Sequence, residues 1–133
     1  HERIANRRYD FCHQTARRLV NTYGVLAFED LQIPNMMQNH CLAKSIADVA
    51  WGQFVRITTD KAACAGRLVA HINPAYTSQD CSQCGQRVPK SLSQRVHQCP
   101  ACQLVMDRDQ NAAINILRHG LVSLGLAPRS PRL

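Results

Sequence analysis

Four cysteines are arranged as two Cys-x-x-Cys pairs, a spacing that proteins use to hold one metal ion. Cys81 and Cys84 form the first pair, and Cys99 and Cys102 form the second, fourteen residues later. Each pair can place two sulfurs about 3.5–4 Å apart around a tight turn, as Zn–S bonds of about 2.3 Å require. Gly85 follows the first pair and suits the positive φ of such a turn. Because four protein ligands leave no open position for water, we expect a structural zinc site, with any catalysis elsewhere.

Other uses of these cysteines fit the sequence less well. The chain has seven cysteines, an odd number, and shows no signal peptide, which argues against a disulfide framework. A thioredoxin-like site needs only one pair, and a zinc deaminase would show His-x-Glu and Pro-Cys-x-x-Cys, both absent here. Iron is an alternative to zinc, because sulfur ligands also suit iron. The remaining cysteines, Cys12, Cys41 and Cys64, lie among apolar residues, and we expect them in the core.

Carboxylates occur at two places where metal ligands are often found. The apolar run 25–28 is typical of a buried strand, and Glu29 and Asp30 follow it directly. Active groups gather at the carboxyl ends of strands in open α/β sheets, although a strand can also simply meet solvent there. Asp107 and Asp109 precede a predicted helix, where they could bind a divalent cation or serve only as its N-cap.

Helices and a second strand are predicted around these carboxylates. Apolar residues at helical spacing predict helices over 4–23 and 42–65, with Gly66 expected to stop the second helix. Residues 68–72 are predicted to form a strand. The order helix, strand, helix, strand predicts that the two strands pair in parallel through a right-handed crossover. The last helix follows Asp109, with Gly120 expected as its stop.

The chain is basic, with a formal net charge of +7 and a pI of about 9.4. For a zinc-ribbon protein this balance favours a nucleic-acid partner, although simple solubility is the alternative. No apolar run approaches the roughly 18 residues of a membrane span, so we expect a soluble intracellular protein without a membrane partner. The candidate nucleic-acid contacts are Arg7, Arg17, Lys44, Arg87, Lys90, Arg95 and Arg108.

A series of short motifs along residues 1–118 closely resembles one family. They are Glu29-Asp-Leu31, Leu42-Ala-Lys-Ser-Ile46 with Asp48 and Trp51, Thr77-Ser-Gln79 before the first cysteine pair, Arg95-x-His97-x-Cys99-Pro-x-Cys102, and Asp107-Arg-Asp109-x-Asn111-Ala-Ala-x-Asn115. Together they resemble the C-terminal part of TnpB (OrfB), the transposon-encoded proteins related to type V CRISPR effectors. The joint order of the motifs is more specific than any one of them.

The resemblance implies an α/β fold, namely a RuvC-like nuclease domain of the RNase H type with a zinc ribbon inserted before its last helix. Family members are RNA-guided DNA endonucleases of transposons, in which three carboxylates bind two Mg²⁺ ions. Glu29 matches the glutamate of that triad and Asp109 its last aspartate, with Asp107 as a less certain neighbour. The four paired cysteines match the family's zinc ligands.

The same resemblance implies that part of the nuclease is missing from this chain. We expect residues 1–73 and 104–124 to form an incomplete RuvC-like domain, 74–103 the zinc ribbon, and 125–133 a disordered tail. The first three strands, with the first catalytic Asp, and the N-terminal region that binds guide RNA have no counterpart here. We therefore expect metal-dependent DNA cleavage in the intact parent, with DNA and guide RNA as partners in a prokaryotic, nucleoid-associated cytoplasm, and no cleavage by this chain alone. The alternative is a zinc-ribbon module that binds nucleic acid without catalysis.

Overall fold

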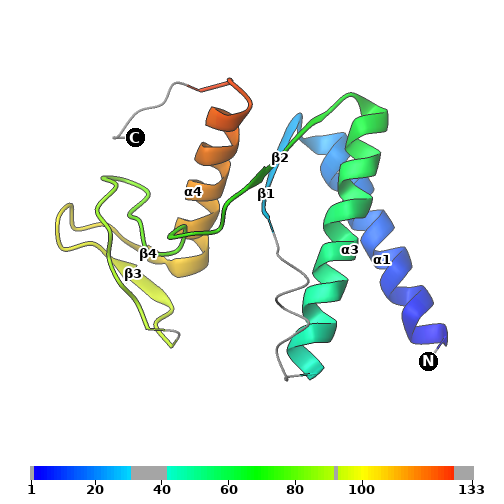
Figure 1. Cartoon of the computed structure of the whole chain (residues 1–133), viewed down its shortest axis with the longest axis horizontal. Helices are drawn as coiled ribbons and strands as arrows, with labels where there is room; N and C mark the ends of the chain where they lie inside the picture. The colour runs from blue at the N-terminus through cyan, green and yellow to red at the C-terminus, as the bar shows by residue number, and fades with distance from the viewer. Residues whose placement is uncertain (1, 31–41, 92, 128–133) are drawn as a thin grey trace. The chain divides into compact units, whose positions relative to one another are not determined.

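The computed structural model describes residues 2–30, 42–91 and 93–127, and for 42–48 it describes the backbone alone. Its elements follow one another as shown in Figure 1: α1 (Glu2–Thr22), β1 (Val25–Glu29), α3 (Leu42–Ala65), β2 (Leu68–Ile72), β3 (Val96–Gln98), β4 (Val105–Asp107) and α4 (Arg108–Ser123). The predicted α/β class and the predicted helices and strands are confirmed. The chain divides into two compact units, His1–Leu26 with Leu31–Val69 and Ala27–Asp30 with Ala70–Leu133.

The first unit is built on the packing of α1 against α3. Ala16 and Val20 of α1 and Ile57 and Ala62 of α3 are its buried apolar residues. Ala16 and Val20 lie four residues apart, about one helical turn, so they form one buried face of α1. Thr58 is also buried, and its hydroxyl donates to the Phe54 carbonyl at 2.8 Å, which satisfies the polar group inside the core.

The end of α3 is set by Gly66, as predicted. Gly66 has a φ of 72°, which only glycine adopts without strain. Its N–H donates to the Ala63 carbonyl at 3.4 Å, and the Arg67 N–H donates to the Ala62 carbonyl at 2.8 Å. These two hydrogen bonds form a Schellman motif, which satisfies carbonyls that the helix end would otherwise leave unpaired.

The prediction that Cys64 lies in the core is wrong. Cys64 is exposed, because it lies near the end of α3, where it lines an open cleft between the helices. Cys12 is half-buried on α1, and Cys41 lies outside the described residues.

The strands β1 and β2 pair in a two-stranded sheet. The Leu68 N–H donates to the Gly24 carbonyl at 3.0 Å, and the Asp30 N–H donates to the Ile72 carbonyl at 2.6 Å. The beginnings of the two strands therefore lie together, as do their ends, which makes the pairing parallel, as predicted. This arrangement brings Glu29 to the carboxyl end of the sheet.

The prediction that Gly120 ends the last helix is wrong. Gly120 lies inside α4 and is buried. A Cβ atom at this position would lie 2.7 Å from the Cβ of Ala27 in β1 and 3.3 Å from the Cβ of Ala70 in β2. Glycine is required here because α4 approaches the sheet this closely.

The helix α4 ends instead at a Schellman motif around Gly125, whose φ is 73°. The Gly125 N–H donates to the Val122 carbonyl at 3.0 Å, and the Leu126 N–H donates to the Leu121 carbonyl at 2.8 Å. The first residues of the predicted disordered tail thus form the cap, and residues 128–133 lie outside the described part.

A small hairpin carries the second cysteine pair. The strands β3 and β4 are antiparallel, with Val96 opposite Asp107 and His97 opposite Met106. His97 is fully buried, and burial, followed by the charge of Lys90, lowers its pKa, so the imidazole is a neutral packing group. Because β4 ends at Asp107 and α4 begins at the next residue, the hairpin leads directly into the helix.

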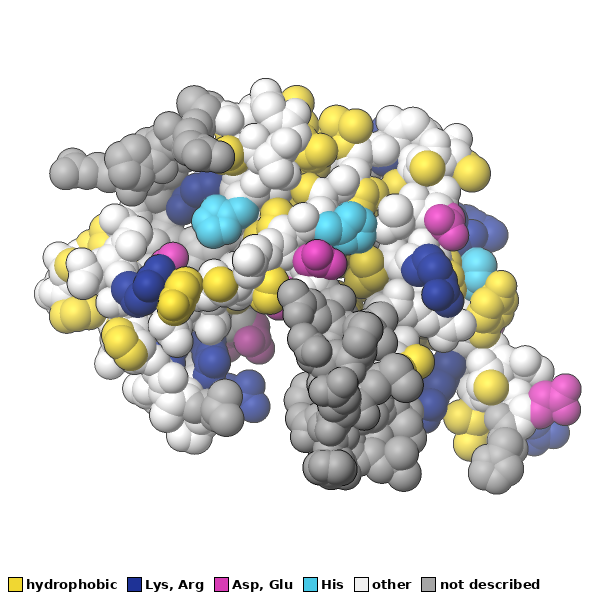
Figure 2. Space-filling view, in the orientation of Figure 1, with side chains coloured by type: hydrophobic (Ala, Val, Ile, Leu, Met, Phe, Trp, Pro, Cys, Tyr) yellow, Lys and Arg dark blue, Asp and Glu magenta, His cyan; other side chains and the backbone are white. Residues whose placement is uncertain are grey.

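Apolar side chains remain at the surface of the first unit. The exposed fraction is 68% for Phe11, 56% for Ile4 and 53% for Tyr9, all on α1. Apolar atoms are also plainly visible on the face shown in Figure 2. No helix in the described part of the chain is long and apolar enough to cross a membrane.

Substitution of Gly120 tests the close approach of α4 to the sheet. The added methyl group of Gly120→Ala has to displace Ala27, so we expect a loss of roughly 1–3 kcal/mol, as is typical of an overpacked core. Thermal unfolding followed by circular dichroism measures it. Gly24→Ala is the matched control, because no described atom lies within 4 Å of the place its methyl group would take, and its stability should change by less than about 1 kcal/mol. Equal stability of the two variants would show that α4 does not pack in this way.

Candidate functional site

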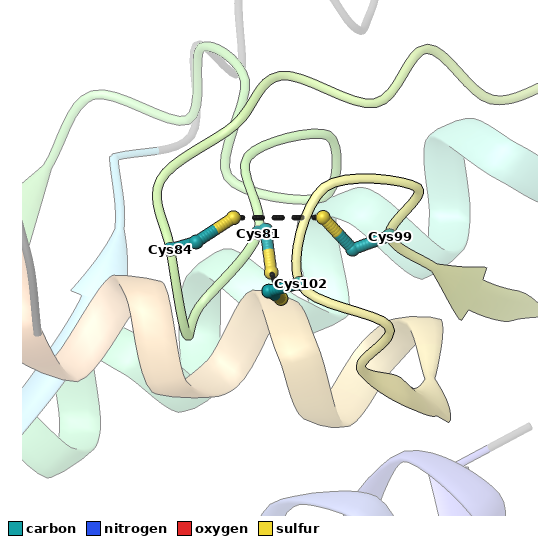
Figure 3. Close-up of side chains that lie close together, drawn as sticks. All are labelled: Cys81, Cys84, Cys99 and Cys102. Carbon is teal, nitrogen blue, oxygen red and sulfur yellow. Dashed lines mark hydrogen bonds between the residues drawn. The ribbon is translucent and has the colours of Figure 1, made fainter.

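The four paired cysteines form one cluster. The sulfurs of Cys81 and Cys102 lie 3.6 Å apart, those of Cys84 and Cys99 lie 3.5 Å apart, and all four lie within 4.8 Å of one another. Figure 3 shows the four side chains pointing toward a common centre. Bonds of about 2.3 Å to a tetrahedral zinc ion would place the sulfurs about 3.8 Å apart, so the cluster fits such an ion.

The two pairs use the same backbone turn. The Gly85 N–H donates to the Cys81 carbonyl, and the Gln103 N–H donates to the Cys99 carbonyl, both at 2.9 Å. The residue after each pair has a positive φ, 84° for Gly85 and 69° for Gln103. Gln103 therefore holds a conformation that costs a side chain about 1–2 kcal/mol. The shared turn aims both pairs of sulfurs at one point.

The electrostatics of the cluster favour a bound cation. The pKa of Cys99 is lowered to about 7: burial acts to raise it, but the N–H groups of Cys102 and Ala101, followed by the Cys84 side chain, outweigh burial. The Leu104 N–H acts to lower the pKa of Cys102, but burial and the neighbouring sulfurs raise it to about 12. One thiolate thus forms readily and opposes the next. A divalent cation would remove this repulsion, and its binding would release the remaining protons.

The first cysteine pair is anchored on α4. Ser82, between the two cysteines, is buried, and its N–H donates to Oδ1 of Asn111 at 2.9 Å. Arg118 donates to the Ser82 carbonyl at 2.8 Å. Two side chains of one helix thus bind the turn that carries two of the sulfurs.

The segment before the first pair is held by the same helix. Nδ2 of Asn115 donates to the carbonyls of Thr77 at 2.8 Å and Asp80 at 2.7 Å, and Nδ2 of Asn111 donates to the Asp80 carbonyl at 2.9 Å. Both asparagines are buried. Their spacing of four residues puts them on one face of α4.

The carboxylate of Glu29 is connected to this network. Oγ1 of Thr77 lies 2.7 Å from Oε1 of Glu29 and 3.1 Å from the Pro74 carbonyl. A hydroxyl has one proton, and the nearer, charged carboxylate is the stronger acceptor. Thr77 is buried, whereas Glu29 is half-buried and its Oε2 has no hydrogen-bond partner among the described residues. One oxygen of Glu29 is therefore fixed, and the other is available.

The side chains of the two aspartates at the start of α4 make different contacts. Asp107 is the N-cap, and its Oδ1 accepts from the N–H groups of Asp109 at 2.9 Å and Gln110 at 3.2 Å. Asp109 is in the first turn of the helix and is exposed. Its side chain has no hydrogen bond or ion pair to the part of the chain that the structure describes. The capping role considered for both residues thus belongs to Asp107.

The side chains of several candidate nucleic-acid contacts are bound to other residues of the segment 76–108. Nζ of Lys90 donates to the Ser78 carbonyl at 2.7 Å, and Nη1 of Arg108 donates to the carbonyls of Ser91 and Gln94, each at 3.1 Å. The Arg87 guanidinium lies 3.4 Å from the centroid of the Tyr76 ring, and its Nε lies 3.1 Å from Oδ1 of Asp80. Burial lowers the pKa of Lys90. Arg7, Arg17 and Arg95 are exposed, and the side chain of Lys44 lies outside the described part.

Two structural roles were not predicted, those of the asparagine pair on α4 and of Gln103, although the sequence carries a signal for each. Asn111 and Asn115 are polar residues four apart, and the residues 112–114 and 116–117 around Asn115 are apolar, which is the pattern of a buried hydrogen-bonding pair. Gln103 occupies the place in the second pair that Gly85 occupies in the first. Nothing in the sequence alone indicated the contact between Thr77 and Glu29, which are 48 residues apart.

Removal of one sulfur tests the metal site. We expect one zinc ion per purified chain, and less than about a tenth of that in Cys81→Ser, because three sulfurs bind zinc much more weakly than four. Atomic absorption measures the metal, and the intense charge-transfer bands of the cobalt-substituted chain report sulfur ligation. Cys64→Ser is the matched control, since Cys64 is exposed and outside the cluster. Equal zinc content in both variants would rule out the four-sulfur site.

Gln103→Gly tests the shared turn. Glycine removes the cost of the positive φ, so we expect the chain to hold zinc about two- to fivefold more tightly, because folding of the turn and metal binding are coupled. Competition with a chromophoric chelator measures the affinity. Gly85→Ala should shift it in the opposite direction. A lower affinity in Gln103→Gly would mean that the second pair uses a different turn in solution.

The sequence of this chain is similar to those of known proteins. Residues 51–116 match the family described as Cas12f1-like, TNB domain. The chain is 38% identical over 125 residues to a putative RNA-guided DNA endonuclease of Streptomyces pristinaespiralis, covering 92% of this chain and 31% of that protein. It is 30% identical over 150 residues to the putative RNA-guided DNA endonuclease InsQ of Escherichia coli K12, covering 99% of this chain and 37% of that protein.

The fold is similar to that of a protein in the cryo-EM structure of a Cas12f1–sgRNA–target DNA complex. The TM-score is 0.65 at 20% identity, covering 86% of this chain and 34% of that one. The chain thus spans about a third of the length of the curated relatives described above. With its motifs, its four-cysteine cluster and these similarities taken together, the chain belongs to the TnpB family.

Proposed function

We propose that this chain is the C-terminal segment of a TnpB-like RNA-guided DNA endonuclease, and that Glu29 and Asp109 are two of its divalent-metal ligands. One observation supports this most strongly. The Glu29 carboxylate is bound by Thr77, and Thr77 is bound by Asn115, on the same helix whose first turn carries Asp109.

The direction of α4 supports a shared site. Gly120 lies against Ala27 of β1, whereas Asn115, nearer the start of the helix, connects through Thr77 to Glu29 at the end of β1. The helix therefore runs antiparallel to β1, and its first turn extends past the carboxyl end of the strand. Asp109 is eleven residues before Gly120, just over three complete turns, so helical periodicity puts it on the same side of α4 as Gly120, which packs against the sheet.

The spacing supports the same conclusion. Asn115, which is connected to Glu29 through Thr77, is six residues after Asp109 in the sequence. This difference corresponds to about 9 Å along the helix axis. Two metal ions about 4 Å apart, with ligand oxygens about 2 Å away on either side, span a similar distance. Carboxylate oxygens are the ligands that Mg²⁺ prefers, and Oε2 of Glu29 and both oxygens of Asp109 are available for it. Asp107, as the N-cap, would fix the first turn and thereby the position of Asp109.

The proposed chemistry is hydrolysis of a phosphodiester bond in DNA. When bound, Mg²⁺ ions activate water and stabilise the leaving oxygen. The part of this chain would be to hold carboxylates at fixed positions and to supply cationic side chains for the phosphate backbone. DNA and guide RNA are proposed partners because the relatives are named as RNA-guided DNA endonucleases.

We propose that the chain alone does not cleave DNA. The family resemblance calls for a third carboxylate, an aspartate on a separate strand, and a two-metal site lacking it should be badly impaired. Ile4 and Phe11, which are exposed on α1, fit a surface that further protein would cover. The zinc ion is proposed to be structural, since four sulfurs leave it no open position.

Divalent-metal binding tests the proposed site. We expect weak Mn²⁺ binding by the zinc-loaded chain, seen as selective paramagnetic broadening of NMR signals from β1 and the start of α4. Glu29→Gln and Asp109→Asn should each weaken it at least about fivefold, because each removes a charged ligand. Thr77→Val should weaken it less, and Thr77→Ser, which keeps the hydroxyl, should retain it. Asp107→Asn is the matched control, since an asparagine also caps a helix.

The outcome separates the candidate functions. Mn²⁺ broadening that is unchanged in both Glu29→Gln and Asp109→Asn would contradict the shared site. Salt-dependent binding of nucleic acid without a Glu29-dependent metal site would instead support a ribbon module that binds without catalysis.

A further inference from the structure

A cleft lies between α1 and α3 within the first unit. Its volume is about 670 Å³, within the range of roughly 300–1,000 Å³ that is usual for small-molecule sites. Buried Val20 and Ile57 lie at its base. The described residues that line it include none of the metal-ligand candidates, neither the four paired cysteines nor the carboxylates of the proposed site.

Three cationic side chains line the cleft. Arg17 comes from α1, and Arg56 and Lys61 come from α3, where Asp60 contributes a carboxylate to the lining. None of these four has an ion pair or a hydrogen bond through its side chain among the residues that the structure describes. Three cations and one carboxylate leave the lining with an excess of positive charge, which favours an anionic ligand.

One wall of the cleft is aromatic. Tyr9, His13 and Arg17 follow one another at steps of four on α1, which places them on a single face of the helix. The rings of Tyr9 and His13 have their centroids 4.2 Å apart. Tyr9 is 53% exposed, so much of its surface is open to a ligand. An exposed ring near several cations is the combination by which proteins bind unpaired nucleotides.

We propose that this cleft binds a nucleotide unit of a single nucleic-acid strand, with its phosphate held by Arg17, Arg56 and Lys61 and its base stacked on Tyr9. Phosphate attracts all three cations, and a base can cover apolar surface that would otherwise face water. This inference rests on the proposed nucleic-acid partner but not on the carboxylate site. It places binding on the helices of the first unit, apart from the zinc ribbon.

The test uses the full zinc-loaded chain and a fluorescein-labelled twelve-nucleotide single-stranded DNA. Fluorescence polarisation gives the affinity at several salt concentrations. The triple variant with Arg17→Gln, Arg56→Gln and Lys61→Gln should bind at least tenfold more weakly, and its slope of log K against log salt should fall by about 0.7 for each lost phosphate contact. Arg18→Gln is the matched control, because Arg18 is an exposed arginine of α1 outside the cleft, and it should bind within about twofold of the native chain.

Two further measurements identify what the cleft recognises. Tyr9→Leu should weaken binding at least threefold without changing the salt slope, since stacking involves no counterion release. In NMR titrations, adenosine 5′-monophosphate should shift signals of α1 and α3 more strongly than inorganic tripolyphosphate at equal concentration. Circular dichroism verifies that each variant keeps its helices, and Arg17→Gln alone replaces the triple variant if that one unfolds.

Three results would overturn the proposal, each in a different way. If the triple variant keeps the native affinity and Cys81→Ser loses binding, the nucleic acid binds at the zinc ribbon instead of the cleft. The proposed function would then stay intact. Tripolyphosphate shifts equal to those of the nucleotide, with no effect of Tyr9→Leu, would mean a simple anion site. No binding of the oligonucleotide at any salt concentration would contradict both this cleft and the proposed nucleic-acid partner.

Discussion

Two buried amide side chains on α4 connect the parts of the site. Asn111 and Asn115 hold the segment 77–82 through hydrogen bonds to its backbone, and that segment carries both Thr77 and the first cysteine pair. An amide buried without its partners costs about 1–3 kcal/mol, so these bonds define one register of the segment on the helix. The orientation of Glu29 and the position of two sulfurs depend on this register.

The sulfur cluster is connected through the backbone to the start of α4. The second cysteine pair lies between β3 and β4, and β4 ends at Asp107, the residue that caps α4. A metal ion bound by the four sulfurs would therefore fix not only the ribbon but also the first turn of the helix, where Asp109 lies. A metal ion in the cluster and the proposed ligand Asp109 would thus be connected through a few residues of backbone. This connection gives a physical reason for the four-cysteine segment to lie just before the last helix.

Much of this arrangement could be predicted from local sequence patterns, and the rest depends on contacts between distant residues. Helical spacing predicted α1 and α3, the cysteine pairs predicted the cluster, and Gly66 predicted the end of α3, because each signal lies within a few residues. The prediction of a helix stop at Gly120 failed because a glycine needed for close packing looks the same in sequence as one needed for a positive φ. The contact between Thr77 and Glu29 spans 48 positions and has no local signal. Cys64 is exposed because a cleft lies beside it between α1 and α3. The sequence of α3 alone does not specify where that cleft lies.

We propose that carboxylates from the end of β1 and the start of α4 share one divalent-metal site. A crystal structure of the zinc-loaded chain soaked in Mn²⁺ tests it most directly, because manganese gives an anomalous signal. We expect a manganese peak bound by Glu29 or Asp109, with the nearest oxygens of the two carboxylates within about 8 Å of each other, the span of a two-metal cluster. Carboxylate oxygens more than about 12 Å apart, or manganese bound only elsewhere, would contradict it.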